Sequence, residues 1–311
     1  MANFVGIDVS KARLDVYWRP SGERAEVSND DAGIVALVER LGAVRPTLVV
    51  LEATGGYELA LVIALGLAKI PTAVVNPRQV RDFAKAIGRL AKTDHIDAGV
   101  LAHFAEALNP EPRPVPEAEA LELAALVARR RQLVDMVVAE KNRLARATAK
   151  VKPGVTAHIK WLQNQVDEIE RDLGQAIRRS PLWRDKDDLL QSIPGVGKVI
   201  ARTLIAELPE LGTLSRSQIA SLAGLAPHNA DSGEHRGQRH IWGGRASVRT
   251  AMYQGALVGT RYNPVLRAMY QRLLVAGKSK KVALIACARR LLLIANAILH
   301  TGKAWAPSGV Q

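Results

Sequence analysis

The chain has 311 residues, of which 48% are hydrophobic, so it is long enough for two domains with buried cores and is not a disordered sequence. Its single cysteine, Cys287, excludes internal disulfides and any cysteine-based zinc site. The net charge of +13 favours a polyanionic partner, and a merely soluble basic surface is the alternative.

The first 75 residues predict an α/β arrangement. Strands are expected at 4–9, 14–18, 23–28, 47–51 and 72–75, with helices from Asp30 or Asp31 to Leu41 and over 57–67. Three hairpin-like strands, a helix, and then strand, helix and strand is the order of an RNase H-like fold. Composition alone also permits other mixed-sheet folds. The segment MANFVGIDVS enters the first strand without a basic and apolar leader, which predicts a cytoplasmic protein, there associated with the nucleoid.

Helices are expected next over 78–87 and, capped by Thr93, through Leu108. The proline-rich stretch NPEPRPVP over 109–116 predicts a stiff linker, so a first domain is placed at 1–110. Residues 111–186 then form the linker and a helical coiled-coil arm, with two long helices over 117–179 that are joined at Lys152–Pro153–Gly154. An isolated amphipathic pair must bury its apolar stripe, which favours a homodimer or homotetramer over a solvated spacer.

The last domain, 187–311, is predicted to be mainly α-helical. The run DLLQSIPGVGKVIARTLIAEL over 188–208 is typical of a helix-hairpin-helix motif, in which exposed amides and Lys198 meet a DNA phosphate; a plain helical hairpin is the alternative. A glycine-rich basic segment follows at 224–245, and three helices follow over 246–299, with breaks near Tyr262–Asn263 and at Gly277.

The apolar run over 282–299 imitates a membrane span. Arg289 and Arg290 stand in its middle, and each costs about 2.5–3.5 kcal/mol at a bilayer centre on insertion scales. A buried helix of a protein without a membrane partner is therefore expected.

The charge is unevenly distributed along the chain. Residues 1–110 carry 12 Lys and Arg against 13 Asp and Glu, a net charge of −1. Residues 111–186 carry 15 against 11, a net charge of +4, and residues 187–311 carry 16 against 6, a net charge of +10. This asymmetry predicts a polyanion held chiefly by the C-terminal half.

Four carboxylates stand at unusual places in the N-terminal domain. Asp8 lies inside the first predicted strand, where a lone buried carboxylate is costly unless it is paired or ligates a metal. Glu52 ends the apolar run VVLE, at the strand end where α/β sheets favour ligands. Asp94 and Asp97 are three residues apart at a helix start, so they share a face.

Each of these residues has an ordinary structural explanation, such as a helix N-terminal charge for Asp94 or a cap for Glu52. Together, however, they form a set of hard oxygen ligands that suits Mg²⁺ or Mn²⁺. Two such ions about 4 Å apart activate a nucleophile and stabilise a leaving oxygen at phosphorus. The sequence therefore predicts a metal site for phosphoryl transfer.

Several motifs give the chain a family resemblance over nearly its whole length. GIDVSK at 6–11, LEATGGY at 51–57 and NPRQVRDFAKAIGRLAKTDHIDA at 76–98 resemble the N-terminal domain of the DEDD transposases of the insertion-sequence one-one-zero family, to which Piv-type DNA invertases are similar. IPGVGKVIARTLIAEL at 193–208, GLAPHNADSGEHRGQRHIWGGRASVR at 224–249 and YQRLLVAGKSKKVALIACARRLL at 270–292 match the second half. Only the 111–186 connector is unspecific.

This resemblance implies a RuvC-like fold for 1–110, with Asp8, Glu52, Asp94 and Asp97 as the DEDD metal ligands. It also implies that Ser232 is the nucleophile of the C-terminal domain. Family members are thought to join DNA through a phosphoserine link, with donor and target DNA chosen by a structured noncoding RNA. By this resemblance the partners are DNA and a guide RNA.

The residues around Ser232 are compatible with that role but do not establish it. A serine followed by a glycine in a polar segment is typical of a turn. The neighbouring segment supplies cations that hold phosphate and histidines that carry protons: Arg236, Arg239, Arg245, His235 and His240. Because the carboxylates lie in another domain, we expect a composite site, assembled between subunits that the arm joins.

Two other functions fit parts of the sequence. A structure-specific nuclease would use only the DEDD carboxylates, with Ser232 as a turn residue. A non-catalytic nucleic-acid-binding scaffold would use only the helix-hairpin-helix and the basic tail, and the DEDD set argues against it. A covalent protein–DNA product separates a recombinase from the nuclease.

Overall fold

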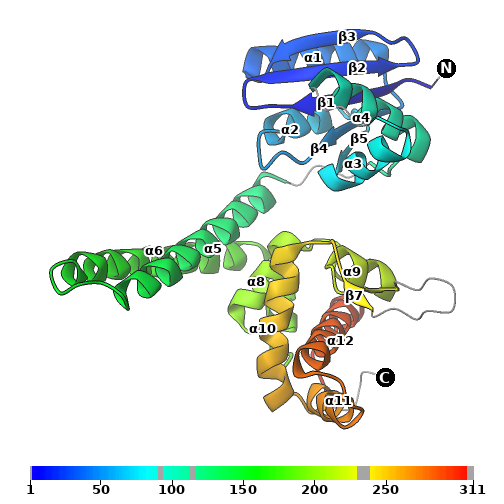
Figure 1. The fold of residues 1–311 in the computed structure, drawn as a ribbon. Coiled ribbons are helices and arrows are strands. Elements are labelled where there is room, and N and C mark those ends of the chain that lie inside the picture. Colours follow the sequence, from blue (N-terminus) through cyan, green and yellow to red (C-terminus); the bar gives the residue numbers. More distant parts are fainter. Residues whose placement is uncertain (1, 90–93, 113–116, 230–238, 307–311) are drawn as a thin grey trace. The chain divides into compact units, whose positions relative to one another are not determined.

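The computed structural model describes residues 2–89, 94–112, 117–229 and 239–306, with the backbone only for 94–96. The chain forms two compact units, Met1–Pro116 and Glu117–Gln311 (Figure 1).

The first unit is built on one mixed sheet (Figure 1). Its elements in chain order are β1 (Phe4–Val9), β2 (Arg13–Arg19), β3 (Arg24–Ser28), α1 (Asp31–Val44), β4 (Leu48–Glu52), α2 (Leu59–Leu67), β5 (Thr72–Val75), α3 (Pro77–Ala86) and α4 (Asp94–Leu108). The strand order is β3-β2-β1-β4-β5; β1, β2 and β3 pair antiparallel, whereas β1, β4 and β5 pair parallel. A mixed sheet with helices, in the predicted element order of an RNase H-like fold, is therefore confirmed.

Helices cover both faces of this sheet. On one face α1 and α2 bury a core that includes Leu37, Leu41 and Leu61 against alternate residues of β1 and β2. On the other face α3 and α4 pack against Val50 and the residues that share its side of the sheet. The alternation of side chains along each strand sends the two sets to opposite sides. Asp30 begins α1 as predicted, since its side chain accepts a hydrogen bond from the Gly33 N–H at 2.9 Å.

The second unit is almost entirely helical. Its elements are α5 (Ala118–Leu144), α6 (Lys152–Arg179), α7 (Pro181–Gln191), α8 (Lys198–Glu207), α9 (Arg216–Leu222), β6 (Pro227–His228), β7 (His240–Ile241), α10 (Ala246–Tyr262), α11 (Pro264–Val275) and α12 (Lys280–Thr301). The three helices predicted over 246–299 are confirmed, with breaks at Asn263 and over 276–279.

The helical pair α5 and α6 differs from the prediction at its turn. The chain turns over 145–151, and Lys152, Pro153 and Gly154 form the first turn of α6 instead of the break. Proline fits the first turn of a helix because its missing N–H has no partner there. The base of the pair packs on the helices that follow, through Leu123, Val127 and partly buried residues of α8.

The helix α12 is long and apolar enough to cross a membrane by length and composition. In this structure Cys287, Leu291, Ala295 and their neighbours are buried in the main core of the second unit. The expected buried helix is confirmed.

Candidate active site

The first carboxylates to consider are on neighbouring parallel strands. In the β1–β4 pairing Ile7 is opposite Leu51, so Asp8 and Glu52, the next residues of each strand, lie at the same level. Side chains alternate along a strand, and these two therefore lie on the face of Gly6 and Val50. Both are partly buried. Strand register alone brings the two predicted ligands together.

The helix α4 adds the aspartates. A Cβ atom at Gly6 would lie 2.2 Å from the carbonyl oxygen of Ala98, so only glycine allows α4 to approach β1 this closely. Asp97, the residue before Ala98, is partly buried, and Asp94 begins the helix one turn earlier. The helix is thus fixed with its N-terminal aspartates at the β1–β4 strand ends.

These residues fit a hard divalent cation by their chemistry, because all four are carboxylates that come from three adjacent elements. No three described side chains of His, Cys, Asp or Glu are grouped to hold a metal, and the Asp94 side chain lies outside the described residues. The fit therefore rests on the chemistry of the four carboxylates and on the strand register that sets Asp8 beside Glu52.

The loop after Glu52 is held by a carboxylate that the sequence analysis did not single out. Oε2 of Glu58 accepts hydrogen bonds from the Thr54 N–H at 3.2 Å, the Thr54 hydroxyl at 2.9 Å and the Gly56 N–H at 2.8 Å. Burial raises the pKa of Glu58, but the hydrogen bonds outweigh it and leave the pKa below its usual value. Gly55 and Gly56 have φ of +77° and +120°, which the tight turn requires.

The predicted residues of the second unit lie around a small two-stranded ladder. Pro227 pairs with Ile241 and His228 with His240, so the ladder brackets the segment that contains Ser232. Ser232, His235 and Arg236 lie outside the described residues. Arg239 is exposed next to β7.

The other two predicted phosphate ligands have different surroundings. Lys198 is exposed in the first turn of α8, where Gly197 offers no side-chain cap. The Arg245 guanidinium instead binds both oxygens of Glu210, at 2.6 and 2.7 Å, and donates to the Glu207 carbonyl at 2.9 Å. This ion pair fixes the start of α10 to the end of α8.

Two family models match the chain. One, described as Transposase, matches residues 5–153, which include the sheet from Val5 onward, α4 and α5. A second, described as Transposase IS116/IS110/IS902 family, matches residues 187–271. The chain belongs to the IS110 transposase family.

Relatives of this transposase include proteins of two kinds. The pilin gene-inverting protein of Moraxella lacunata is 26% identical over 311 residues, covering 96% of each chain. The insertion element IS116 uncharacterized 44.8 kDa protein of Streptomyces clavuligerus is 28% identical over 186 residues, covering 56% of this chain and 46% of that protein. The structure of T. thermophilus RuvC in complex with Holliday junction substrate matches at a TM-score of 0.29 and 15% identity, covering 36% of this chain and 100% of that chain. The fold assignment rests on strand order, since a TM-score this low is no support for it.

One more acid, which the sequence analysis did not single out, lies beside Asp8. Asp15 on β2 is paired with Asp8 in the antiparallel register, so the two share a face, and Asp15 is only 2% exposed. Its Oδ2 accepts a hydrogen bond from Nε of Arg13 at 2.9 Å. The signal was present: in a hairpin that turns over 10–12, residue 8 falls opposite residue 15.

Proposed function

We propose that this transposase cuts and rejoins DNA with a metal-bound carboxylate site, Asp8, Glu52, Asp94 and Asp97, and with Ser232 as the nucleophile. The observation that carries the proposal is that strand register sets Asp8 beside Glu52 on one sheet face, and that Gly6 lets the helix that carries Asp97 pack against the same strand. Carboxylate oxygens in such a position are the ligands that Mg²⁺ and Mn²⁺ prefer.

The chemistry needs each residue type in turn. Divalent ions, Mg²⁺ or Mn²⁺, supply charge stabilisation at phosphorus and at the attacking and leaving oxygens when bound. Oγ of Ser232 forms a bond to phosphorus as one P–O ester bond of the strand breaks; the serine proton passes to a base, and the leaving oxygen becomes a hydroxyl. The hydroxyl of a second strand then forms the new ester and releases the serine. The number of ester bonds is conserved, so no external energy source is needed.

Basic residues hold the DNA in this proposal. Lys198 and the uncapped amides of α8 contact a phosphate in the manner of a helix-hairpin-helix. Arg236 and Arg239 stabilise charge near Ser232. Arg245 is assigned a different part, since Glu210 occupies its guanidinium: it anchors α10 behind the ladder.

The proposed function also implies binding partners. Donor and target DNA are the substrates, in keeping with the name of the Moraxella relative. A guide RNA is proposed on the family resemblance alone. A homodimer or homotetramer is favoured by apolar side chains that stay exposed on α5 and α6, among them Met136, Val138 and Trp161.

The test replaces Asp97 by asparagine, which keeps the size and removes the charge. We expect Asp97→Asn to abolish strand cleavage in Mg²⁺ and to weaken Mn²⁺ binding measured by calorimetry, while the melting temperature changes little. The matched control is Glu39→Gln, an exposed carboxylate on α1, which covers the opposite face of the sheet. Cleavage by Asp97→Asn at the wild-type rate would remove the carboxylate site from the proposal.

A further inference from the structure

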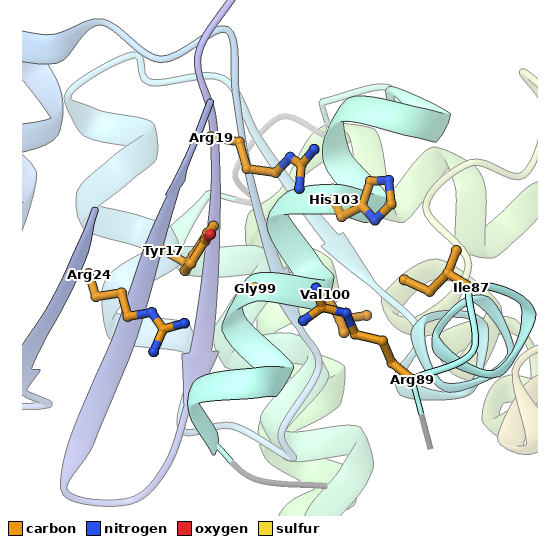
Figure 2. A pocket seen from close by; sticks show the side chains of 8 residues that line it. All are labelled: Tyr17, Arg19, Arg24, Ile87, Arg89, Gly99, Val100 and His103. Atoms are coloured by element: carbon orange, nitrogen blue, oxygen red, sulfur yellow. The ribbon is translucent and has the colours of Figure 1, made fainter. Parts of the chain in front are cut away.

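A polar pocket of about 110 Å³ opens in the first unit, on the same face of the sheet as the carboxylates. Figure 2 shows side chains from β2, β3, α4 and the end of α3 around it. The residues that matter for its chemistry are Tyr17, Arg19, Arg24, Arg89, Gly99 and His103. Three arginines in one small pocket are unexpected in a region whose net charge is close to zero.

Two of these arginines are available to a ligand. In the part of the chain that the structure describes, neither Arg24 nor Arg89 has a carboxylate within ion-pair distance. Arg19 differs, because its guanidinium forms an ion pair with Oε2 of Glu106 at 2.7 Å. This ion pair holds the Arg19 side chain at the side of the pocket. Figure 2 shows the Arg24 and Arg89 side chains reaching from opposite sides toward the middle of the pocket.

The other lining residues orient the Arg24 guanidinium and add a hydrogen-bond donor. The Arg24 guanidinium lies over the Tyr17 ring, 5.5 Å from its centroid, which holds the group while its N–H edges stay open. The His103 ring packs edge-on against Phe83 at 5.2 Å, and an imidazole carries at least one ring N–H in either charge state. Gly99 adds no side chain, so α4 leaves the Tyr17 ring uncovered there.

These features select a compact anion. The pocket admits several water molecules, hence one tetrahedral anionic group, and its exposed lining is mainly polar, with Ile87 and Val100 as the aliphatic members. Guanidinium groups that approach from two sides match the oxygens of a phosphate better than a single-sided carboxylate. A phosphate group is the ligand that this lining recognises.

The position of the pocket relative to the carboxylates indicates which phosphate of a nucleic acid the pocket would bind. Tyr17 is opposite Gly6 in the β1–β2 register, just as Asp15 is opposite Asp8, so pocket and carboxylates share one sheet face. Along α4, the pocket residues Gly99 and His103 stand two and six residues after Asp97, about 3 to 9 Å at 1.5 Å per residue. That range corresponds to about one to three nucleotides of a strand that rises 3.4 Å per nucleotide.

We propose that this pocket binds one backbone phosphate of the DNA strand that enters the carboxylate site, and so sets which phosphodiester reaches the acids. The inference rests on the proposed function for the identity of the strand. The phosphate-binding part of the inference rests on the residues that line the pocket.

The experiment measures DNA binding, not cleavage, on the full-length protein. A fluorescent duplex of arbitrary sequence is titrated in metal-free buffer across a series of NaCl concentrations, and the slope of log affinity against log salt is taken. The double variant Arg24→Gln/Arg89→Gln should lower the magnitude of that slope by about one, the loss of one phosphate contact. It should also weaken binding most at low salt.

The matched control removes two charges from the other side of the sheet. Arg45 and Lys69 are exposed, follow α1 and α2, and have φ of 49° and 56°, a region that asparagine tolerates. Arg45→Asn/Lys69→Asn should keep the wild-type slope. An equal slope in the pocket variant and the control would overturn the proposal. The proposal would also be overturned if the pocket variant kept the wild-type slope on the DNA duplex and showed a lower slope only on single-stranded RNA of the same sequence.

Two further outcomes separate a folding defect and a failed proposed function from a failed pocket. Arg89→Gln alone, in an exposed position, stands in if the double variant fails to show a wild-type circular dichroism melt, and it should give part of the same loss. Wild-type protein that binds with the expected slope but never cuts DNA would refute the proposed function and leave the pocket standing.

Discussion

The two units hold their proposed functional residues by different means. In the first unit, strand register and the Gly6–Ala98 contact fix Asp8, Glu52 and Asp97 on regular elements. In the second unit, the segment that contains Ser232 lies between the two-residue strands β6 and β7, and Ser232 itself is outside the described residues. Ligands of a metal need accurate positions, which regular helices and strands supply.

The units also differ in how they arrange charge. Residues 187–311 have a net charge of +10 because basic residues outnumber acidic ones, whereas the net charge of −1 of residues 1–110 is the sum of nearly equal numbers of acidic and basic residues. On one sheet face the first unit carries both the acids and the pocket arginines Arg19, Arg24 and Arg89, which come from β2, β3 and the end of α3. A near-zero sum can therefore conceal charges of both signs, and the expectation that the C-terminal half chiefly holds the nucleic acid stays a prediction.

The largest effect is expected from the serine. Ser232→Ala should lose the covalent protein–DNA adduct, detected as a shifted band in denaturing gels, and should lose all recombination because no other residue forms the phosphoserine. DNA binding and the melt should stay at the wild-type values. Recombination by Ser232→Ala would make the nuclease the better function and the serine a turn residue.

A mixture of two inactive proteins sharpens the same comparison. If the site is assembled between subunits, Ser232→Ala mixed with Asp97→Asn should recover part of the activity that each lacks. No recovery after co-refolding would place both halves of the site in one chain.

A smaller but still large effect is expected from one glycine. Gly6→Ala forces α4 away from β1, since the new Cβ would meet backbone atoms at 2.2 and 2.3 Å. A displacement of about 1 Å costs about 100-fold in rate, so cleavage should fall by that order although every ligand is present. Gly42→Ala on α1, which meets nothing within 4 Å, is the control and should be neutral or slightly stabilising. Equal activity of the two variants would contradict the close approach of α4.

Glu58 should act through the position of Glu52. Glu58→Gln weakens the hydrogen bonds to Thr54 and Gly56, and changes of residues behind metal ligands cost about 10–100-fold in metal affinity. Raising the Mn²⁺ concentration should restore cleavage, because the ligands themselves are intact. Failure of excess Mn²⁺ to restore it would mean that Glu58 does more than hold the loop.

The smallest effect concerns stability in the second unit. Burial raises the pKa of Asp187 against the opposing attraction of Arg202. For a raised folded-state pKa, the stabilising contribution is complete below the unfolded value near 3.9 and is lost as the pH rises through the folded value. Asp187→Asn should therefore raise Tm by about 2 °C at pH 7 and by less near pH 4, followed by circular dichroism. Asp188→Asn, an exposed neighbour, should change Tm less, and a lower Tm for Asp187→Asn would contradict the sign.

Local patterns predict much of the fold. The apolar alternation predicts β1 over Phe4–Val9 and β5 over Thr72–Val75 at the bounds that they have, because a strand with one or two buried faces is set by its own side chains. The turn between α5 and α6 is mispredicted because Pro153 both breaks and begins helices, and the sequence does not say which.

The site is predictable to the extent that each residue is unusual by itself. Asp8 and Glu52 are acids in apolar strands, so they stand out. Arg24 and Arg89 do not, since an exposed arginine on an edge strand or after a helix is ordinary, and only the packing of α4 across β2 brings them together. Likewise Gly195 has a φ of +106°, and a Cβ atom there would lie 2.8 Å from the Gly255 carbonyl oxygen, so the PGVG turn packs closely on α10.

The parallel pairing of β1 with β4 has a consequence for the newly made protein. The β1–β2 hairpin is local and forms in about 1–10 μs, which brings Asp8 to Asp15 at once. Glu52 joins Asp8 only after the chain has crossed over through α1, and Asp97 only after α4 has docked, so both wait for slow, long-range closure. A first unit that is still incomplete on the ribosome therefore lacks part of the proposed metal set, since Asp8 and Asp15 meet before Glu52 and Asp97 join them.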